Sequence, residues 1–185
     1  HVPAGKPVRL QLSSNDVIHS FWVPSLMGKA DLIPGRTNEL TFAAEKPGVY
    51  DGQCAEFCGL QHTFMGLKVI ADEPAAFEAW RAAQLAPAPK PANEAQKVGR
   101  DVFLLNPCMA CHAIRGTTAG ARVGPDLTHL ASRHTIAAGR APLTRGQLAA
   151  WITDPQAMKP GVNMPNVPIP PEQLDPLLDY LMALE

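Results

Sequence analysis

The stretch that decides how the first half of the chain is built is GQCAEFCGLQHTFM, residues 52–65. It places Cys54 four residues before Cys58 and follows the pair with His62 and Met65. Thiolate, thioether and imidazole groups are ligands that suit copper in proteins. The stretch therefore predicts a copper-binding loop.

The second cysteine decides between kinds of copper site. A mononuclear blue-copper site needs one cysteine, two histidines and a weak methionine, so one cysteine would be left over. Two bridging thiolates between a pair of copper ions use both Cys54 and Cys58, with a terminal histidine on each ion. His62 supplies one of these, and His19 is best placed for the other because bulky apolar residues surround it at a strand end.

Two other interpretations of this loop remain open. Cys54 and Cys58 could form a disulfide, with the histidine and the methionine incidental. A zinc ion could instead take two cysteines and two histidines, which would leave Met65 without a role.

The residues around the loop have the pattern of β structure. Val8–Leu12 alternates apolar and polar residues, and residues 16–23 are rich in β-branched and aromatic residues. Further short strands are expected at residues 39–43 and 65–70, because Pro-Gly pairs punctuate the chain between the runs. Short strands at roughly ten-residue spacing favour a sandwich or a barrel over residues 1–72.

A proline-rich segment separates this half from a helical second half. Residues 74–85 predict a helix that begins with proline and closes the first domain. The sequence APAPKPA that follows suits neither a regular helix nor a central strand, and predicts a semi-rigid spacer. Later helices are expected at residues 94–105, 144–153 and 171–184. We therefore expect domains at residues 1–83 and 94–185, joined by a linker at residues 84–93.

The helical half contains CMACH at residues 108–112, the signature for covalent attachment of c-type haem. Cys108 and Cys111 would form thioether bonds to the porphyrin, and His112 would bind the iron. A thioredoxin-like redox pair is disfavoured because no βαβ pattern surrounds the motif. A zinc site is disfavoured because no second Cys/His pair has the required spacing.

A haem that transfers electrons needs a second axial ligand, and Met164 is our first choice. It lies in KPGVNMP, residues 159–165, a loop of the kind that can present a methionine to the iron. His/Met ligation raises the haem potential, which suits a respiratory donor. Met158 is the main competitor, ahead of Met109, His129 and His134.

Four segments of the first half resemble the CuA domain of cytochrome c oxidase subunit II. These are DVIHSFWVP at 16–24, GKAD at 28–31, IPGR at 33–36 and GQCAEFCG at 52–59. The resemblance covers nearly all of residues 1–72 and implies a cupredoxin-like Greek-key β-barrel.

The same resemblance implies the roles of the ligands in a binuclear copper centre. Cys54 and Cys58 would bridge both copper ions, with His19 and His62 terminal. Met65 would be a weak ligand to one copper and the backbone carbonyl of Glu56 a weak ligand to the other. In that family the glutamate side chain also reaches a magnesium ion at the interface with the catalytic subunit.

Residues 94–185 resemble a class I cytochrome c domain, which implies an all-α fold. GPDL at residues 124–127 is similar to the turn that follows the haem motif in that family. There the carbonyl of Pro125 would accept a hydrogen bond from the His112 ring. Trp151 and Tyr180 either pack on the haem or belong to an ordinary aromatic core.

A CuA domain followed by a cytochrome c domain resembles subunit II of a caa-type haem–copper oxidase. The resemblance implies electron transfer from a soluble donor through haem c to the copper pair. From there electrons would pass to catalytic subunit I of an oxidoreductase that reduces oxygen and pumps protons. The chain itself would hold no catalytic residue. Two alternatives are the same electron inlet in a nitric oxide reductase and, in a different class, a copper-carrier or binding module.

Charge and hydropathy add expectations about partners and location. The net charge of -1 gives no reason to expect a nucleic-acid partner. No run of 18 apolar residues predicts a transmembrane helix, and no signal peptide is visible. The chain begins at His1 without a methionine, so we expect a processed or truncated piece whose membrane anchor lies elsewhere. Thioether attachment and the copper site both suggest the extracytoplasmic (periplasmic) face of the plasma membrane.

Overall fold

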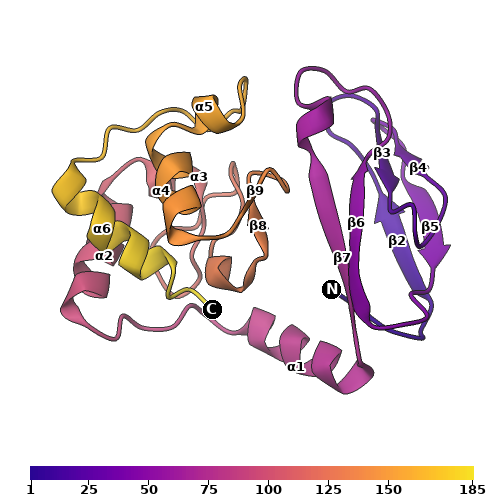
Figure 1. Cartoon of the computed structure of the whole chain (residues 1–185), viewed down its shortest axis with the longest axis horizontal. Coiled ribbons are helices and arrows are strands. Elements are labelled where there is room, and N and C mark those ends of the chain that lie inside the picture. Colours follow the sequence, from indigo (N-terminus) through magenta and orange to yellow (C-terminus); the bar gives the residue numbers. More distant parts are fainter. The chain divides into compact units, whose positions relative to one another are not determined.

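The computed structural model describes residues 1–185, which form two compact units (Figure 1). The first unit consists of residues 1–83 and 137–140, and the second of residues 84–136 and 141–185. No helix in the chain combines the length and the apolar character needed to cross a lipid bilayer.

The first unit is built from short strands in two sheets. One sheet has the strand order β1-β7-β6-β3-β4, and β2 pairs with β5 in the other. Their bounds are β1 Val2–Pro3, β2 Val8–Leu12, β3 His19–Trp22, β4 Ala30–Leu32, β5 Asn38–Phe42, β6 Gly48–Cys54 and β7 Gly66–Asp72. A short 3₁₀ turn, His62–Phe64, lies between β6 and β7, and helix α1, Pro74–Leu85, follows β7.

The core of this unit lies between the two sheets. Buried residues of the larger sheet, such as Val69 and Ala71, belong to the same apolar cluster as Phe42 of β5. Alternate residues of β2, β5 and β6 are more buried, as a half-buried strand requires. The predicted cupredoxin-like β domain is confirmed as the fold class.

One predicted strand begins later than its composition suggests. Residues 16–18 precede β3 and lie outside any strand, with a bend at residues 15–17, although Val17 and Ile18 are β-branched. The Ser14 hydroxyl donates a hydrogen bond to the Val17 carbonyl at 2.6 Å and also contacts the Asp16 carboxylate. This local bonding competes with strand pairing and leaves Val17 and Ile18 exposed.

The second unit is helical, as predicted for a class I cytochrome c domain, and that fold class is confirmed. Its helices are α2 Glu94–Leu105, α3 Cys108–Cys111, α4 Arg145–Thr153, α5 Pro155–Met158 and α6 Pro171–Leu181. A 3₁₀ turn, Leu130–Ser132, and a two-stranded ribbon, β8 Thr135–Ile136 with β9 Ala141–Pro142, complete it. The side chain of Asn93 caps α2 by accepting from the Gln96 amide at 2.9 Å. Helix α6 ends three residues before the predicted position.

Helices α2 and α6 form the main packing contact of this unit. A buried cluster that includes Phe103, Ile114, Leu177 and Leu184 fills the space around them. Trp151 and Tyr180 also contribute to this cluster, Tyr180 with only 2% of its surface exposed.

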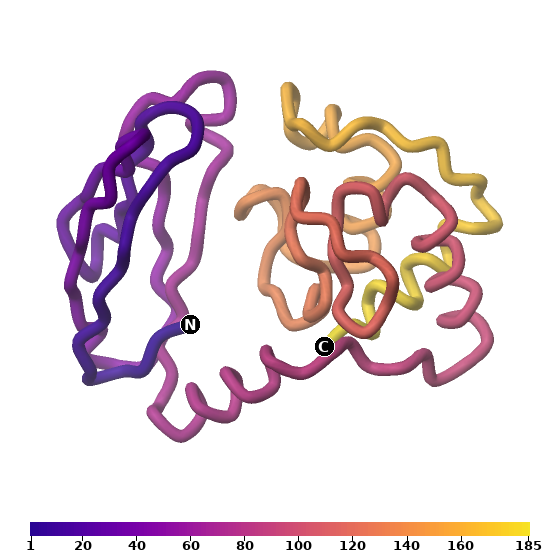
Figure 2. The backbone as a smooth tube through the Cα atoms, turned by 180° about the vertical axis from the view of Figure 1, so that it is seen from behind, coloured from indigo at the N-terminus to yellow at the C-terminus, as the bar shows by residue number.

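The proline-rich segment before α2 is bonded to the second unit. The Ala88 amide donates to the Arg115 carbonyl at 2.9 Å. His129 contacts the Ala86 carbonyl through Nε2 at 3.1 Å and the Glu185 carbonyl through Nδ1 at 2.7 Å. Figure 2 shows the C-terminus close to this segment, as the two contacts of His129 require.

Candidate copper and haem sites

The candidate copper ligands lie where β3, β6 and β7 bring three chain segments together. Antiparallel pairing places Phe21 of β3 opposite Cys54 of β6. The Cys54 amide donates to the Met65 carbonyl at 3.2 Å, and the Ala55 amide donates to the Ser20 carbonyl at 3.0 Å. These bonds close the loop between Cys54 and Met65 and fix it beside the start of β3.

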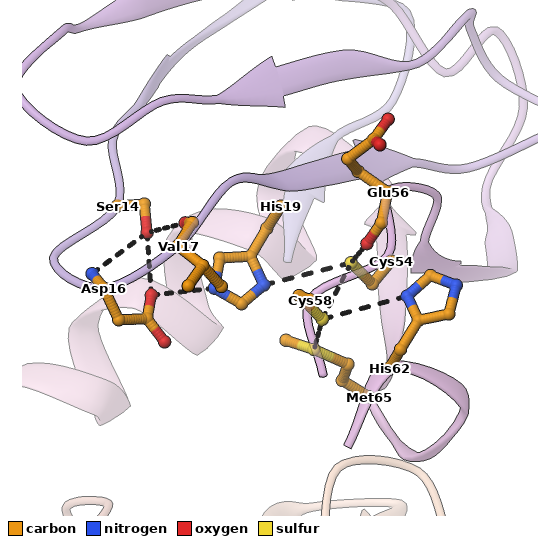
Figure 3. A network of polar contacts seen from close by, with 9 residues as sticks. All are labelled: Ser14, Asp16, Val17, His19, Cys54, Glu56, Cys58, His62 and Met65. Carbon is orange, nitrogen blue, oxygen red and sulfur yellow. Dashed lines mark hydrogen bonds and ion pairs between the residues drawn. The ribbon is translucent and has the colours of Figure 1, made fainter. Parts of the chain in front are cut away.

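Two free thiols occupy the middle of this site, with a histidine on either side (Figure 3). The Cys54 and Cys58 sulfurs are 3.7 Å apart. His19 Nδ1 lies 3.9 Å from the Cys54 sulfur, and His62 Nδ1 lies 3.8 Å from the Cys58 sulfur. Donor atoms of His19, Cys54 and Cys58 all lie within 4.8 Å of one another, as a metal site requires. The donor set suits copper.

Met65 and the backbone carbonyl of Glu56 complete the set of candidate copper ligands, each next to a different cysteine sulfur. The Met65 thioether is 3.3 Å from the Cys58 sulfur, and the Glu56 carbonyl oxygen is 3.2 Å from the Cys54 sulfur. The Glu56 carboxylate points away from the sulfurs in Figure 3 and pairs with Lys29 Nζ at 3.3 Å. All six residues expected at the copper site are therefore brought together.

Asp16 is a site residue for which the sequence pattern assigned no role. Its carboxylate lies 2.8 Å from His19 Nε2, so it orients the ring with Nδ1 toward the Cys54 sulfur. Hydrogen bonds from His19, and then from Ser14, lower the pKa of Asp16 to about 2. The bond to Asp16 correspondingly raises the pKa of His19. The spacing of Asp16 three residues before His19 was the available signal.

The two thiols ionise unequally because they are so close. Burial opposes ionisation of Cys54, but hydrogen bonds from the backbone at Ser20 and Glu56 and from the two histidines lower its pKa to about 6. Burial and then the neighbouring Cys54 raise the pKa of Cys58 to about 11. Ionisation of one thiol therefore opposes ionisation of the other, and a metal ion held by both sulfurs would displace the proton that remains.

The haem motif lies on one short turn of helix, α3, and on the residue that follows it. The His112 amide donates to the Cys108 carbonyl at 3.0 Å, which holds the histidine against the cysteines. His112 Nδ1 donates to the Pro125 carbonyl at 2.8 Å, so Nε2 retains its lone pair for a metal. A β-carbon at Gly124 would stand 2.6 Å from the His112 ring, so only glycine allows this approach. The arrangement fits covalent haem with His112 as axial ligand.

Met164 lies in a loop that Gln156 of α5 holds at three points. The Gln156 side-chain amide donates to the Val162 and Met164 carbonyls at 2.8 and 3.1 Å, and its oxygen accepts from the Gly161 amide at 2.9 Å. Sequence reasoning gave Gln156 no role, because the residues that it bonds lie on a loop without regular structure.

Two of the competitors for the second axial position, Met158 and His129, make contacts that disfavour binding to iron. Met158 packs against the buried core of the second unit. Both ring nitrogens of His129 contact backbone carbonyls, which leaves neither free for iron. Met164 therefore remains our choice for the second axial ligand.

A cupredoxin-like domain with a thiolate–imidazole site, followed by a helical domain with a C-x-x-C-H turn, defines a two-domain electron-transfer protein. Comparison with known proteins gives the family. Residues 1–72 match the family described as "Cytochrome C oxidase subunit II, periplasmic domain", and residues 96–185 match "Cytochrome c". The chain therefore joins a domain of the cytochrome c oxidase subunit II periplasmic family to a cytochrome c domain. The first domain thus implies copper, and the second implies haem c.

Two curated relatives match along the whole chain. "Cytochrome c oxidase subunit 2" of Alkalihalophilus pseudofirmus is 41% identical over 186 residues, and that of Bacillus sp. (strain PS3) is 35% identical over 196 residues. Both alignments cover 100% of this chain and 54% of the relative, so the chain spans about half the length of the curated relatives it matches.

Among solved structures, the periplasmic domain of subunit II of cytochrome oxidase (CoxB) of Bradyrhizobium japonicum is similar. It is 44% identical over 43% of this chain and 57% of that chain, with a TM-score of 0.42.

Proposed function

We propose that this chain is the electron-entry part of a haem–copper oxidase, relaying electrons from a soluble donor toward catalytic subunit I. Haem c and the copper centre, when bound, each accept and release single electrons. Cys108, Cys111, His112 and Met164 would hold the haem, with Pro125 orienting His112. In the whole enzyme, subunit I would reduce oxygen and pump protons.

The single observation that carries this proposal is the arrangement of sulfur and nitrogen around Cys54 and Cys58. Each sulfur has its own histidine, 3.8 to 3.9 Å away, and its own weak donor, the Glu56 carbonyl at Cys54 and the Met65 thioether at Cys58. This symmetry supports a binuclear copper centre rather than one copper with a spare thiol. Sharing an electron over two metals and two soft sulfurs would keep bond-length changes small, which favours rapid transfer.

The expected partners and location follow from the same assignment. We propose domains at residues 1–83 and 94–185 with a linker at 84–93, on the extracytoplasmic face and held to the membrane by segments outside this chain. The Glu56 carboxylate is more than two-fifths exposed, so it is available for magnesium at an interface with subunit I. A nitric oxide reductase would use the same inlet, and only the catalytic partner distinguishes the two enzymes.

The test is to measure the copper and iron content per chain, and to record EPR and absorption spectra, on protein that carries its metals and haem. We expect two copper ions and one covalently bound iron per chain, with an EPR signal in which one unpaired electron couples equally to two copper nuclei. Cys58→Ser should replace that signal with the pattern of a single copper, while the haem spectrum stays unchanged. A parental copper signal in Cys58→Ser would rule out bridging by this residue. Readily exchangeable, colourless copper would favour a carrier instead.

A further inference from the structure

The start of the segment expected to act as a spacer, residues 84–88, is hydrogen-bonded to Arg115 of the second unit. The Arg115 guanidinium donates to the Gln84 carbonyl and, at 3.4 Å, to the Leu85 carbonyl. The Arg115 carbonyl accepts from the Ala88 amide at 2.9 Å. Together with the contact from His129 to the Ala86 carbonyl, these bonds hold residues 84–88 on the second unit.

This docking creates a cleft of about 340 Å³ within the second unit. Residues 88–91 of the segment form one wall. The other walls come from Lys97 and Arg100 of α2, from residues 115–117, and from Tyr180 of α6. The cleft exists only while the segment stays bonded, because four of its lining residues belong to that segment.

The lining is strongly basic. It contains Lys90, Lys97, Arg100 and Arg115 and no acidic residue. Three of these cations have a carboxylate partner outside the lining, namely Glu94, Asp101 and Asp126, all more than half exposed. Such exposed pairs are weak, and Lys90 has no ion pair, so positive charge is in excess at the cleft.

Tyr180 supplies a second, independent indication of a ligand. Only 2% of its surface is exposed, yet its hydroxyl makes no hydrogen bond within the chain. Burial raises the pKa of Tyr180, and the nearby Arg100 charge opposes that rise. The hydroxyl therefore stays protonated at neutral pH and remains a donor beside Arg100. This hydroxyl is not among the side-chain atoms that are fully buried without a partner, so it is open to the cleft, where an anion would accept its hydrogen bond.

We propose that this cleft binds a phosphate group, carried by a free phosphate or by an anionic lipid headgroup, and that the bound phosphate holds the linker on the cytochrome c unit. Phosphate offers several acceptor oxygens, which match guanidinium, ammonium and hydroxyl donors converging from four chain segments. Since one wall of the cleft is the linker, the ligand binds the docked linker better than the free one. Phosphate and docking therefore stabilise each other.

The first test titrates pyrophosphate into the full, metal-loaded chain in its reduced, diamagnetic state, with the amides of Ala88, Gly116 and Thr117 followed by NMR. We expect saturable shifts at these amides and slower proteolysis of the linker. Lys90→Gln and Arg100→Gln should each weaken binding about fivefold or more, and so should Tyr180→Phe, which removes one hydroxyl. Lys46→Gln, in the first unit, is the control and should bind as the parent does.

The second test separates the two sources of phosphate. Co-sedimentation with phosphatidylglycerol vesicles, but not phosphatidylcholine vesicles, with loss in Arg100→Gln and competition by pyrophosphate, would indicate a lipid headgroup. Saturable pyrophosphate binding without sedimentation would indicate a free phosphate. Shifts that never saturate, or that are equal in the parent and all three cleft variants, would overturn the proposal. None of these measurements depends on electron transfer. Their outcome therefore tests phosphate binding separately from the proposed respiratory role.

Discussion

Gly99 of α2 lies directly against Pro176 of α6, so closely that a β-carbon at position 99 would stand 1.9 Å from the Pro176 carbonyl oxygen. The same β-carbon would be 2.8 Å from Cβ of Tyr180. Backbone meets backbone at this crossing, and no side-chain rearrangement can make room. The core of the cytochrome c unit therefore depends on a hydrogen atom at position 99.

Gly99→Ala should destabilise the second unit by about 2 to 4 kcal/mol, because α2 and α6 must separate to admit the methyl group. Gly146→Ala is the matched control, since it lies in α4 with nothing within 4 Å of its added β-carbon. The control should be neutral or slightly stabilising, as alanine favours a helix over glycine. Thermal unfolding followed by circular dichroism would compare them, and equal melting temperatures would contradict the close crossing.

Met164→Ala should leave the haem attached through Cys108 and Cys111 but remove its second axial ligand. We expect the potential to fall by on the order of 0.1 V or more, within the roughly 0.8 V range that axial ligands control. The reduced haem should also bind carbon monoxide. Met158→Ala is the control, since Met158 packs in the core, and it should lower stability while the potential changes little. The reverse result would assign the ligand to Met158.

The sequence predicted regular elements well where local signals were strong. The helices at Pro74–Leu85 and Glu94–Leu105 and the strand at Val8–Leu12 have the expected bounds. Proline starts the first helix and Asn93 caps the second, so both beginnings are marked locally. Residues 16–18 were predicted wrongly as strand because the Ser14 side chain, three residues away, captures the Val17 carbonyl.

In the candidate sites, too, residues within one short stretch could be predicted and residues that act over long separations could not. Four copper ligands and the three haem-motif residues each lie within one short stretch, so spacing alone predicts them. Gln156 could not be predicted, because its role depends on how a loop folds back onto α5. Arg115 could not be predicted either, since it bonds residues 30 and 31 positions away and turns an expected spacer into a docked segment. Contacts over such separations leave no periodic signal in the sequence.

Asp16→Asn should weaken copper binding without removing any ligand. The substitution takes away the charged acceptor at His19 Nε2, so the imidazole becomes a poorer and less firmly oriented ligand. We expect roughly a 10- to 100-fold loss of copper affinity, measured by competition with a chelator. Glu56→Gln is the control, because Glu56 faces the site through its backbone carbonyl, and its copper affinity should match the parent's. Equal affinities in both variants would show that Asp16 does not support His19.

Asp126 should make the stability of the second unit depend on pH in the acid range. Burial acts to raise its pKa, but hydrogen bonds from Thr128 and the charges of Arg115 and Arg133 outweigh this, so the pKa is lowered on folding. A lowered folded-state pKa contributes stability above the unfolded pKa, near 4, and that contribution disappears as pH falls through the folded value. Because the side chain is 51% exposed, the contribution should be at most about 1 kcal/mol.

Asp126→Asn keeps an acceptor for Thr128 but removes the charge, so it isolates the pH-dependent part. At neutral pH the variant should melt a few degrees below the parent, and the difference should shrink as the pH falls below about 4. Melting temperatures of the second unit at a series of pH values, at one ionic strength, would measure this convergence. A difference that stayed constant across the series would mean that the carboxylate acts by its shape alone, and one that widened in acid would reverse the sign of the pKa shift.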